Sequence, residues 1–374
     1  MKIIITGDFY ISDKYKDSNL FDSSITEVLF NADYRIVNLE APITKNYPKN
    51  KIIKTGPHLR MSEENVINHL DELNIDCVTL ANNHILDYGT EGINNTFDVL
   101  NKNRISYLGA GENLSDATKP YLFEKKGVKV ALVNFCENEW SIAESNSPGA
   151  NPMDIIDNAH QIKYAKELAD YVIVIVHGGH EYYNLPSPRM QKQYRFYADQ
   201  GADIVVGHHT HCISGNEVYN GVPIYYSLGN FLFTDNSTID EWYTGLVLEL
   251  EILNGSIRHK VHPVRQQKRS FNLSLLKGKD KDEVLKRVEN FNRTIIDVHR
   301  LNESWVKYID VQSEEYLNYW SPLSFIKNRY IKSIFRRLGI NFINKKGALL
   351  YLNLLRCEAH KYISESILKK YIDS

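Results

Sequence analysis

The chain has 374 residues, a formal charge of −2, and hydrophobic and charged fractions of 43% and 24%. These values are ordinary for a folded globular protein, and the near-neutral charge argues against a nucleic-acid partner. Four scattered cysteines without a CxxC spacing argue against a disulfide framework. The three isoleucines at positions 3–5 form too short an apolar run for a signal peptide or a membrane span, so we expect a cytoplasmic protein.

Short apolar runs bounded by polar loops predict strands, and segments with helical periodicity lie between them. The predicted strands cover residues 2–6, 35–39, 76–80, 128–135, 171–176, 203–206 and 223–228. Helices are predicted over 62–74 and 159–170, and alternating residues around Asn-Gly over 245–264 predict a hairpin. Strands that alternate with helices are typical of an α/β layered fold.

The sequence changes character shortly after the predicted hairpin. Helix-forming stretches begin near residue 270 and continue to the C-terminus. We therefore predict two parts, an α/β domain over residues 1–268 and a mainly helical region over residues 269–374.

Five of the predicted strands end in side chains that bind metals or transfer protons. In chain order these are Asp8, Glu40, Asn83, His84, His177, His180, Glu181, His208, His209 and His211. Each of them alone fits a polar loop or a capped turn, but the carboxyl ends of strands in α/β sheets meet and form sites. Their joint occurrence favours a metal site. On an extended segment, the spacing of His209 and His211 puts both rings on one side.

Mixed carboxylate, amide and imidazole ligands suit Mn, Fe or Zn rather than calcium or a thiolate-bound structural zinc. With this many candidate ligands, two divalent ions that share one carboxylate are the economical arrangement. Such a pair acidifies water and stabilises both the entering and the leaving oxygen at a phosphorus centre. A neighbouring histidine that is not a ligand would protonate the leaving group.

Six segments in this order resemble the CapA family, the capsule or poly-γ-glutamate synthesis proteins of the calcineurin-like metallophosphoesterase superfamily. They are GDFY (7–10), NLEAPIT (38–44), LANNHILDYGTEGINNTFDVL (80–100), GAGENLSDATKP (109–120), the segment from HGGHE to GHHTH (177–211) and GVPIYYSLGNFLF (221–233). The resemblance runs from residue 3 to about residue 235 and leaves the segment after 270 without a counterpart. It implies an αββα metallophosphoesterase-like sandwich with a two-metal site.

The resemblance also implies roles for individual residues. One ion would be held by Asp8, Glu40 and His211, and the other by Glu40, Asn83, His177 and His209. His84 would be the proton donor, oriented by Asp87. Two positions depart from the superfamily pattern, because Tyr10 stands where it has a histidine and Glu40 where it has the bridging aspartate. The first ion would then need water or His208 to complete its shell.

Further residues are candidates for contact with the substrate. They are His208, His180, Glu181, Asn230, His58 and Arg60. Glu181 either orients a histidine or is a solvated carboxylate, and Asn230, with Ser227, either touches substrate or forms a turn. His58 and Arg60, with Lys54, either bind an anionic group or belong to a surface loop.

Residues 316–357 contain eight basic residues and no Asp or Glu, and their apolar positions follow helical spacing. A basic amphipathic helix suits peripheral contact with an anionic membrane surface. The alternative, which is the commoner arrangement, is a helix whose apolar face packs on the main domain.

The leading functional hypothesis is a metal-dependent hydrolase of the phosphoesterase type. Its substrate would be a small phosphorylated molecule or an anionic cell-envelope polymer, and hydrolysis of an amide in such a polymer is a variant. The alternative is a non-catalytic assembly component of capsule or poly-γ-glutamate synthesis with a structural or vestigial metal site.

Overall fold

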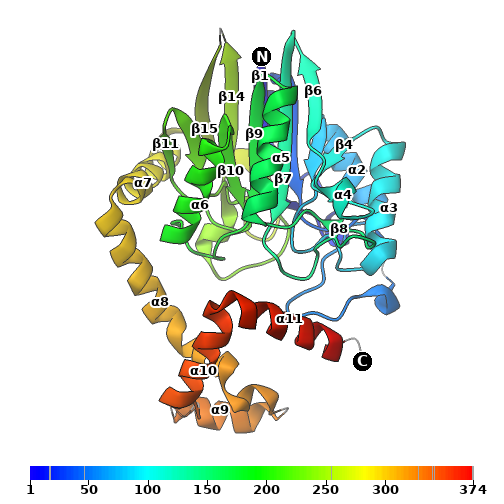
Figure 1. Cartoon of the computed structure of the whole chain (residues 1–374). Coiled ribbons are helices and arrows are strands. Elements are labelled where there is room, and N and C mark those ends of the chain that lie inside the picture. The colour runs from blue at the N-terminus through cyan, green and yellow to red at the C-terminus, as the bar shows by residue number, and fades with distance from the viewer. Residues whose placement is uncertain are drawn as a thin grey trace. The chain divides into compact units, whose positions relative to one another are not determined.

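The computed structural model describes residues 1–16, 18–45, 47–253, 255–326, 328–338, 340 and 342–372. The chain divides into two compact units, Met1–Asn302 and Glu303–Ser374. Unit 1 holds two β-sheets with helices on their outer sides (Figure 1), and it carries every residue of the predicted site.

The first sheet has the order β16-β15-β14-β1-β2-β3-β4, and β13 pairs with the end of β1. These strands are β1 (Lys2–Tyr10), β2 (Tyr34–Leu39), β3 (Cys77–Thr79), β4 (Ser106–Leu108), β13 (Asn230–Phe233), β14 (Thr244–Leu253), β15 (Ser256–Gln266) and β16 (Leu273–Leu275). Strands β1 to β4 run parallel, so their carboxyl ends lie at one edge of the sheet.

The second sheet has the order β11-β12-β10-β9-β7-β6, in which β7, β9, β10 and β12 run parallel. Its strands are β6 (Tyr121–Lys125), β7 (Val128–Cys136), β9 (Tyr171–His177), β10 (Ile204–His208), β11 (Asn216–Tyr219) and β12 (Val222–Tyr225). Two short strands, β5 (Ala110–Gly111) and β8 (Gly149–Ala150), form a separate ladder.

Alternate residues of each central strand enter different cores. Ile3 and Ile5 of β1 pack with Ile173 and Ile175 of β9 between the two sheets, whereas Ile4 faces a second core that includes the inward residues of three helices. These helices are α1 (Ser23–Phe30), α2 (Glu63–Glu72) and α3 (Gly89–Lys102). Because side chains alternate along each strand, one face of the sheet packs against the other sheet and the opposite face packs against helices.

The outer face of the second sheet is covered in the same way. Val172, Val174 and Val176 of β9 pack with residues of α5 (Ile155–Leu168) and α6 (Pro188–Asp199). A short helix, α4 (Leu114–Ala117), lies beside β5 and β8. The order helix, sheet, sheet, helix confirms the predicted αββα sandwich.

The seven predicted strands and both predicted helices are confirmed, with ends shifted by a few residues. Residues 226–228 are an exception, because β12 ends at Tyr225 and the chain then turns toward β13. The predicted hairpin is formed by β14 and β15, which pair from Thr244–Arg265 to Leu253–Ser256. Its predicted turn residue Asn254 lies outside the described residues.

The C-terminal region is helical, as predicted. It contains α7 (Gly278–Ile296), α8 (Val298–Trp320), α9 (Arg329–Arg337), α10 (Lys345–Arg356) and α11 (Glu358–Ile372). Helix α7 and β16 belong to unit 1, so the boundary predicted at residue 268 falls inside that unit and stays a prediction. Among the described residues, no helix combines the length and apolar character needed to cross a membrane.

Candidate metal centre

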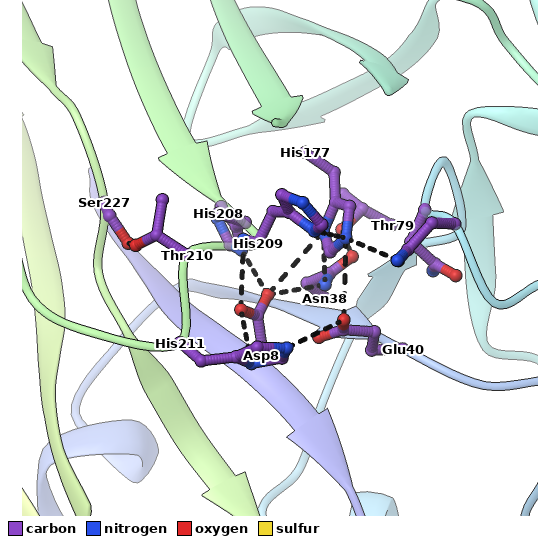
Figure 2. A network of polar contacts seen from close by, with 12 residues as sticks. Asp8, Asn38, Glu40, Thr79, His177, His208, His209, Thr210, His211 and Ser227 are labelled. Carbon is purple, nitrogen blue, oxygen red and sulfur yellow. Dashed lines mark hydrogen bonds and ion pairs between the residues drawn. The ribbon is translucent and has the colours of Figure 1, made fainter. Parts of the chain in front are cut away.

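The predicted polar side chains meet where the carboxyl ends of strands from both sheets face each other. Asp8 comes from β1 and Glu40 follows β2, while His177 ends β9 and His209 and His211 follow β10. Figure 2 shows their side chains directed toward one another around Asp8 and Glu40. All five are buried, with exposed fractions of 5% or less.

Close backbone packing brings these strand ends together. Asp8 N–H donates to the carbonyl of Gly229 over 3.1 Å just before β13. A Cβ on Gly7 would lie 1.8 Å from that same carbonyl oxygen, so only glycine allows this approach. A Cβ on Gly207 would likewise lie 2.2 Å from the carbonyl oxygen of Tyr226. The glycines of the GD and GH pairs thus place Asp8 and the histidine loop.

Two groups of ligand atoms have the spacing of metal sites. Glu40, His177 and His209 form one group, and Asp8, Glu40 and His211 form the other, each with its ligand atoms within 4.8 Å of one another. Glu40 belongs to both. These are the two sets that the family resemblance implies, apart from Asn83, whose Oδ1 lies 3.1 Å from His177 Nε2.

Glu40 shows that the residues fit a cation. Both carboxylate oxygens are buried, and neither has a hydrogen-bond partner among the described residues. Oε1 lies 3.5 Å from His177 Nε2 and 3.7 Å from His211 Nε2. Burial and the neighbouring Asp8 raise the pKa of Glu40 well above its usual range. A buried carboxylate in this condition costs free energy unless a cation compensates it.

His177 Nε2 gives the same indication. His209 Nδ1 lies 3.2 Å from it and Asn83 Oδ1 3.1 Å from it, in addition to the Glu40 oxygen. One imidazole nitrogen carries at most one proton and directs it to one partner. Three groups that converge on it are better matched by a shared ion than by hydrogen bonds alone.

Burial and neighbouring groups favour the neutral forms of His177 and His209 and the ionised form of Asp8. Burial, followed by the nearby His209, lowers the pKa of His177 well below its usual range, and burial with the nearby His211 lowers that of His209 to about 3. For Asp8, burial alone raises the pKa, but His208, His177 and His211 outweigh it, and the net shift is downward. Neutral imidazole and ionised carboxylate are the states that bind metals.

Asn38 and Thr79 support this centre, and sequence reasoning missed both. Asn38 Nδ2 donates to Asp8 Oδ1 over 2.7 Å and lies 3.2 Å from His177 Nδ1. Thr79 Oγ1 donates to Asn38 Oδ1 over 3.1 Å, which fixes the amide (Figure 2). Asn38 lies in β2, two positions before Glu40, so the alternation of the strand was the signal that could have identified it.

The histidine loop corrects one expectation. His209 and His211 do not converge through extended alternation, because their φ angles are +90° and +53°. His209 N–H donates to Asp8 Oδ2 over 3.1 Å, and His211 Nδ1 lies 2.9 Å from Asn230 Oδ1. Histidine rarely adopts left-handed backbone, and such conformers persist where the surroundings impose them. The left-handed backbone of this turn, rather than strand alternation, therefore directs both rings toward the centre.

His84 and Asp87 lie in the loop after β3. His84 Nδ1 lies 2.7 Å from Asp87 Oδ2, as the prediction that Asp87 orients His84 requires. Lys54 Nζ bonds Asp87 Oδ1 and lies 3.3 Å from His84 Nδ1, and its side chain is 2% exposed. Burial lowers the pKa of His84, and the hydrogen bond that His84 donates to Asp87 acts against this shift. Lys54 therefore belongs to this buried cluster rather than to a surface loop.

A sixth strand end, that of β7, adds carboxylates that sequence reasoning missed. Glu139 Oε1 lies 3.9 Å from His209 Nε2, and its side chain is 38% exposed. Burial raises the pKa of Glu139, and its hydrogen bond with Asn83 acts against this. Burial also raises the pKa of Glu137 to about 6, although Glu137 accepts a hydrogen bond from Gly179 N–H. Acidic side chains thus line the outer edge of the centre.

Four of the predicted substrate contacts lie in or beside the centre. His208 is buried with Nδ1 3.4 Å from Asp8 Oδ1, and Asn230 also donates to the Trp242 carbonyl. His180 is half-buried and Glu181 exposed in the loop after β9. These residues lie in or beside the centre.

Two predicted substrate contacts are engaged elsewhere in the chain. His58 Nε2 lies 2.8 Å from the Ile52 carbonyl oxygen. Arg60 pairs with Asp13 at 2.7 Å and donates to the Thr44 carbonyl. Their role in substrate binding stays a prediction.

Comparison with known proteins shows a family whose matched region includes the centre. The family model described as "Bacterial capsule synthesis protein PGA_cap" matches residues 2–235, which include the whole centre. The "PGA biosynthesis protein CapA" of Bacillus subtilis (strain 168) is 38% identical over 244 residues, 64% of this chain and 63% of that protein. The "Capsule biosynthesis protein CapA" of Bacillus anthracis is 37% identical over 224 residues, 57% of this chain and 54% of that protein. The chain thus spans less than two thirds of these relatives.

Two solved structures show more distant likeness. A "Putative 5'-Nucleotidase" from Staphylococcus aureus has a TM-score of 0.45 at 16% identity and covers 78% of this chain and 58% of its own. A "novel phosphatase" from Mycoplasma pneumoniae has a TM-score of 0.42 at 14% identity and covers 72% of this chain and 95% of its own. Scores of this size say nothing about activity.

Proposed function

Because the chain belongs to the family of bacterial capsule synthesis proteins, we propose that it is a metal-dependent hydrolase of the phosphoesterase type that acts in the synthesis of a capsule or envelope polymer. The family membership confirms the resemblance found in the sequence. The observation that carries the proposal is the buried carboxylate of Glu40, which has no hydrogen-bond partner among the described residues and which two groups of ligand atoms share.

The residues that would hold two divalent ions of Mn, Fe or Zn are those of the two groups. Asp8, Glu40 and His211 would hold one, and Glu40, Asn83, His177 and His209 the other. When bound, such ions supply Lewis-acid activation of water and of a phosphoryl oxygen. Oxygen and imidazole donors without a thiolate match this choice of metals.

His84 would exchange a proton with the leaving oxygen. Its Nδ1 is engaged by Asp87, so Nε2 is the ring nitrogen available to a substrate. Asp87 stabilises the imidazolium form against the effect of burial, and Lys54 and the Leu59 N–H hold the Asp87 carboxylate in place. The Asp87 carboxylate therefore both orients His84 and keeps its charged form accessible.

The charge of the centre suggests why an anionic substrate would need the ions. Asp8, Glu40 and Glu139 lie at or beside the centre, and the buried cation Lys54 is paired with Asp87. Without divalent ions this surface repels phosphate or a polymer carboxylate. With them it becomes attractive, so a small phosphorylated or anionic polymer substrate is compatible with the site. The names of the Bacillus relatives favour a polymer of this kind.

The test combines metal content with hydrolysis in the full chain. Protein loaded with Mn²⁺ would be analysed by elemental mass spectrometry and assayed on a panel of phosphomonoesters and phosphodiesters, beside Glu40→Gln and His84→Ala. We expect Glu40→Gln to lose bound metal and His84→Ala to keep metal but lose about 10²-fold or more in turnover. Glu217→Gln is the matched control, because Glu217 is also a buried carboxylate but is fully paired with Arg195 and Tyr226.

Three outcomes would contradict a phosphoesterase. Absence of metal from folded wild-type protein would remove its basis. Bound metal without turnover on these esters, together with turnover on a γ-glutamyl amide, would establish the amide variant. Bound metal without either reaction would leave a non-catalytic assembly role.

A further inference from the structure

Unit 2, residues 303–374, exposes rows of large apolar side chains. On α9 and the residue after it, Tyr330, Ile334 and Leu338 are exposed by 70%, 57% and 64%. They are spaced by four, so they form one row along the helix. An apolar row exposed to water costs free energy, and such rows often mark sites that bind another protein or a membrane.

Helix α10 repeats this arrangement. Leu349, Leu352 and Leu355 follow each other at intervals of three and are exposed by 66%, 46% and 56%. Figure 1 shows α9 and α10 in orange to red. Two neighbouring helices therefore each leave an apolar row uncovered within the described part of unit 2.

The charges around these rows are of one sign. Residues 316–357 contain no Asp or Glu, and the basic side chains that the structure describes there are those of Arg329, Lys332, Arg337, Lys345, Lys346 and Arg356. The side chain of Arg336 and residues 327, 339 and 341 lie outside the described part of this segment. Among the described side chains of 316–357, no ion pair with a carboxylate is present. The positive charge is therefore not neutralised within this segment.

Aromatic side chains border the same surface. Tyr316, Tyr319 and Trp320 at the end of α8 are exposed by 50%, 57% and 40%. Trp320 stacks with Tyr351 of α10, with ring centroids 6.5 Å apart. Tyrosine and tryptophan prefer the boundary between lipid headgroups and hydrocarbon.

From this combination we propose that α9, α10 and the end of α8 form a peripheral binding surface for anionic lipid bilayers. Apolar rows flanked by unpaired lysines and arginines are what an interfacial helix needs, because the apolar side chains enter the headgroup region while the cations meet lipid phosphates. An acidic protein would match the charge but not two uncovered apolar rows. A second copy of the chain would place like charges against each other. The contact is peripheral, since no described helix suits a membrane span. This inference does not rest on the proposed hydrolase activity.

Vesicle sedimentation with the full chain tests the electrostatic part. Vesicles of phosphatidylcholine with 30 mol% phosphatidylglycerol would be compared with pure phosphatidylcholine in about 0.1 M salt, where surface charges are only partly screened. A basic residue near an anionic surface contributes about 1 kcal/mol, or about five-fold in partitioning. Lys345→Gln with Lys346→Gln should therefore weaken binding about thirty-fold. Lys279→Gln with Lys281→Gln is the matched control, because these exposed lysines occupy the first turn of α7.

Substitution of the apolar row tests the hydrophobic part. Ile334→Ser with Leu338→Ser should reduce binding to anionic vesicles, whereas Ile53→Ser with Ile156→Ser, which removes exposed isoleucines from unit 1, should not. Circular dichroism would verify that each variant is folded. Equal binding to neutral and anionic vesicles, no binding by wild type, or equal losses in the controls would overturn the proposal. So would a concentration-dependent dimer, seen by light scattering, that Ile334→Ser abolishes.

Discussion

Asn38 shows how one buried amide can organise a centre without being a ligand. It donates to Asp8, contacts His177 and is itself fixed by Thr79. Asp8 belongs to one ligand group and His177 to the other, so the amide couples the two. A hydrogen-bonded partner of this kind holds ligand atoms in position before an ion arrives.

Replacement of this amide should weaken metal binding while every ligand remains. We expect Asn38→Ala to lower Mn²⁺ affinity about 10- to 100-fold, the range found for residues that orient metal ligands. A competition titration with a chromophoric chelator measures this constant. Asn158→Ala is the control, since Asn158 is equally buried and bonds the Pro152 carbonyl away from the centre. Equal affinity of Asn38→Ala and wild type would contradict the assigned role.

His209 should make the metal-free protein sensitive to acid. Its pKa of about 3 in the folded state lies below the ordinary 6.5, so between these values the unfolded chain binds a proton that the folded one does not. The free energy of unfolding then falls as the pH falls from about 6.5, by about 1.4 kcal/mol per pH unit for one proton. The raised pKa of Glu40 acts with the opposite sign, which makes a comparison of variants necessary.

Denaturant unfolding in EDTA between pH 7 and pH 5 tests this dependence. His209→Gln should reduce the slope of unfolding free energy against pH by roughly one proton. His160→Gln, on the exposed side of α5, should leave the slope unchanged. Identical slopes for His209→Gln and wild type would show that His209 titrates normally in the folded protein.

At the scale of elements, the loop after β10 holds two histidines in left-handed backbone. The φ angles of +90° and +53° at His209 and His211 are strained for any residue with a Cβ. The close approach of β1, β13 and β10 determines the path of this loop, since Gly7 and Gly207 leave no room for side chains. The strand contacts therefore stabilise a turn that the loop alone would avoid.

Glycine scanning should reveal this strain. In EDTA, His211→Gly should be more stable to unfolding than His211→Ala by about 1 kcal/mol, because glycine adopts positive φ without penalty. At His177, which ends the regular strand β9, the order should reverse, with glycine less stable than alanine by roughly 0.5–1 kcal/mol. Chemical denaturation of the four variants measures both differences. A His211→Ala variant as stable as His211→Gly, or more stable, would exclude backbone strain at His211.

At the scale of the whole molecule, the contacts of α7 place it with the sandwich. Val284, Val288 and Ile295 are buried, and the Ile295 carbonyl accepts from Gln191 of α6 over 2.7 Å. Asn292 accepts from the backbone N–H of Asn216 in β11 over 2.6 Å. These contacts favour a boundary near residue 302 over the one that the sequence predicts at 268.

Truncation distinguishes the two boundaries. A chain of residues 1–302 should unfold cooperatively with nearly the stability of unit 1, whereas a chain of residues 1–268 should be unfolded or largely destabilised. The shorter chain loses six buried apolar side chains, those of Phe271, Leu273, Val284, Val288, Ile295 and Leu301, each stabilising by about 1.5–3 kcal/mol, against a typical total of 5–15 kcal/mol. Calorimetry measures both. A stable 1–268 chain would support the boundary predicted from the sequence.

The sequence by itself determined the α/β class, the order of most strands and the chemistry of the site. Each of these depends on local patterns. Apolar runs of a few residues define strands, and the polar residue that follows each run lies at a carboxyl end, where parallel strands must meet. Asp8, Glu40, His177 and the histidines after β10 were therefore identifiable before any contact was known.

Only the tertiary structure decided how these ends face each other across two sheets. The roles of Asn38, Lys54 and Glu139 depend on contacts between residues distant in sequence, and no local pattern distinguishes them from ordinary polar residues. The left-handed loop likewise follows from packing against glycines in other strands. Local sequence patterns determine which residues form a strand, whereas the direction of a side chain depends on the elements that pack around it.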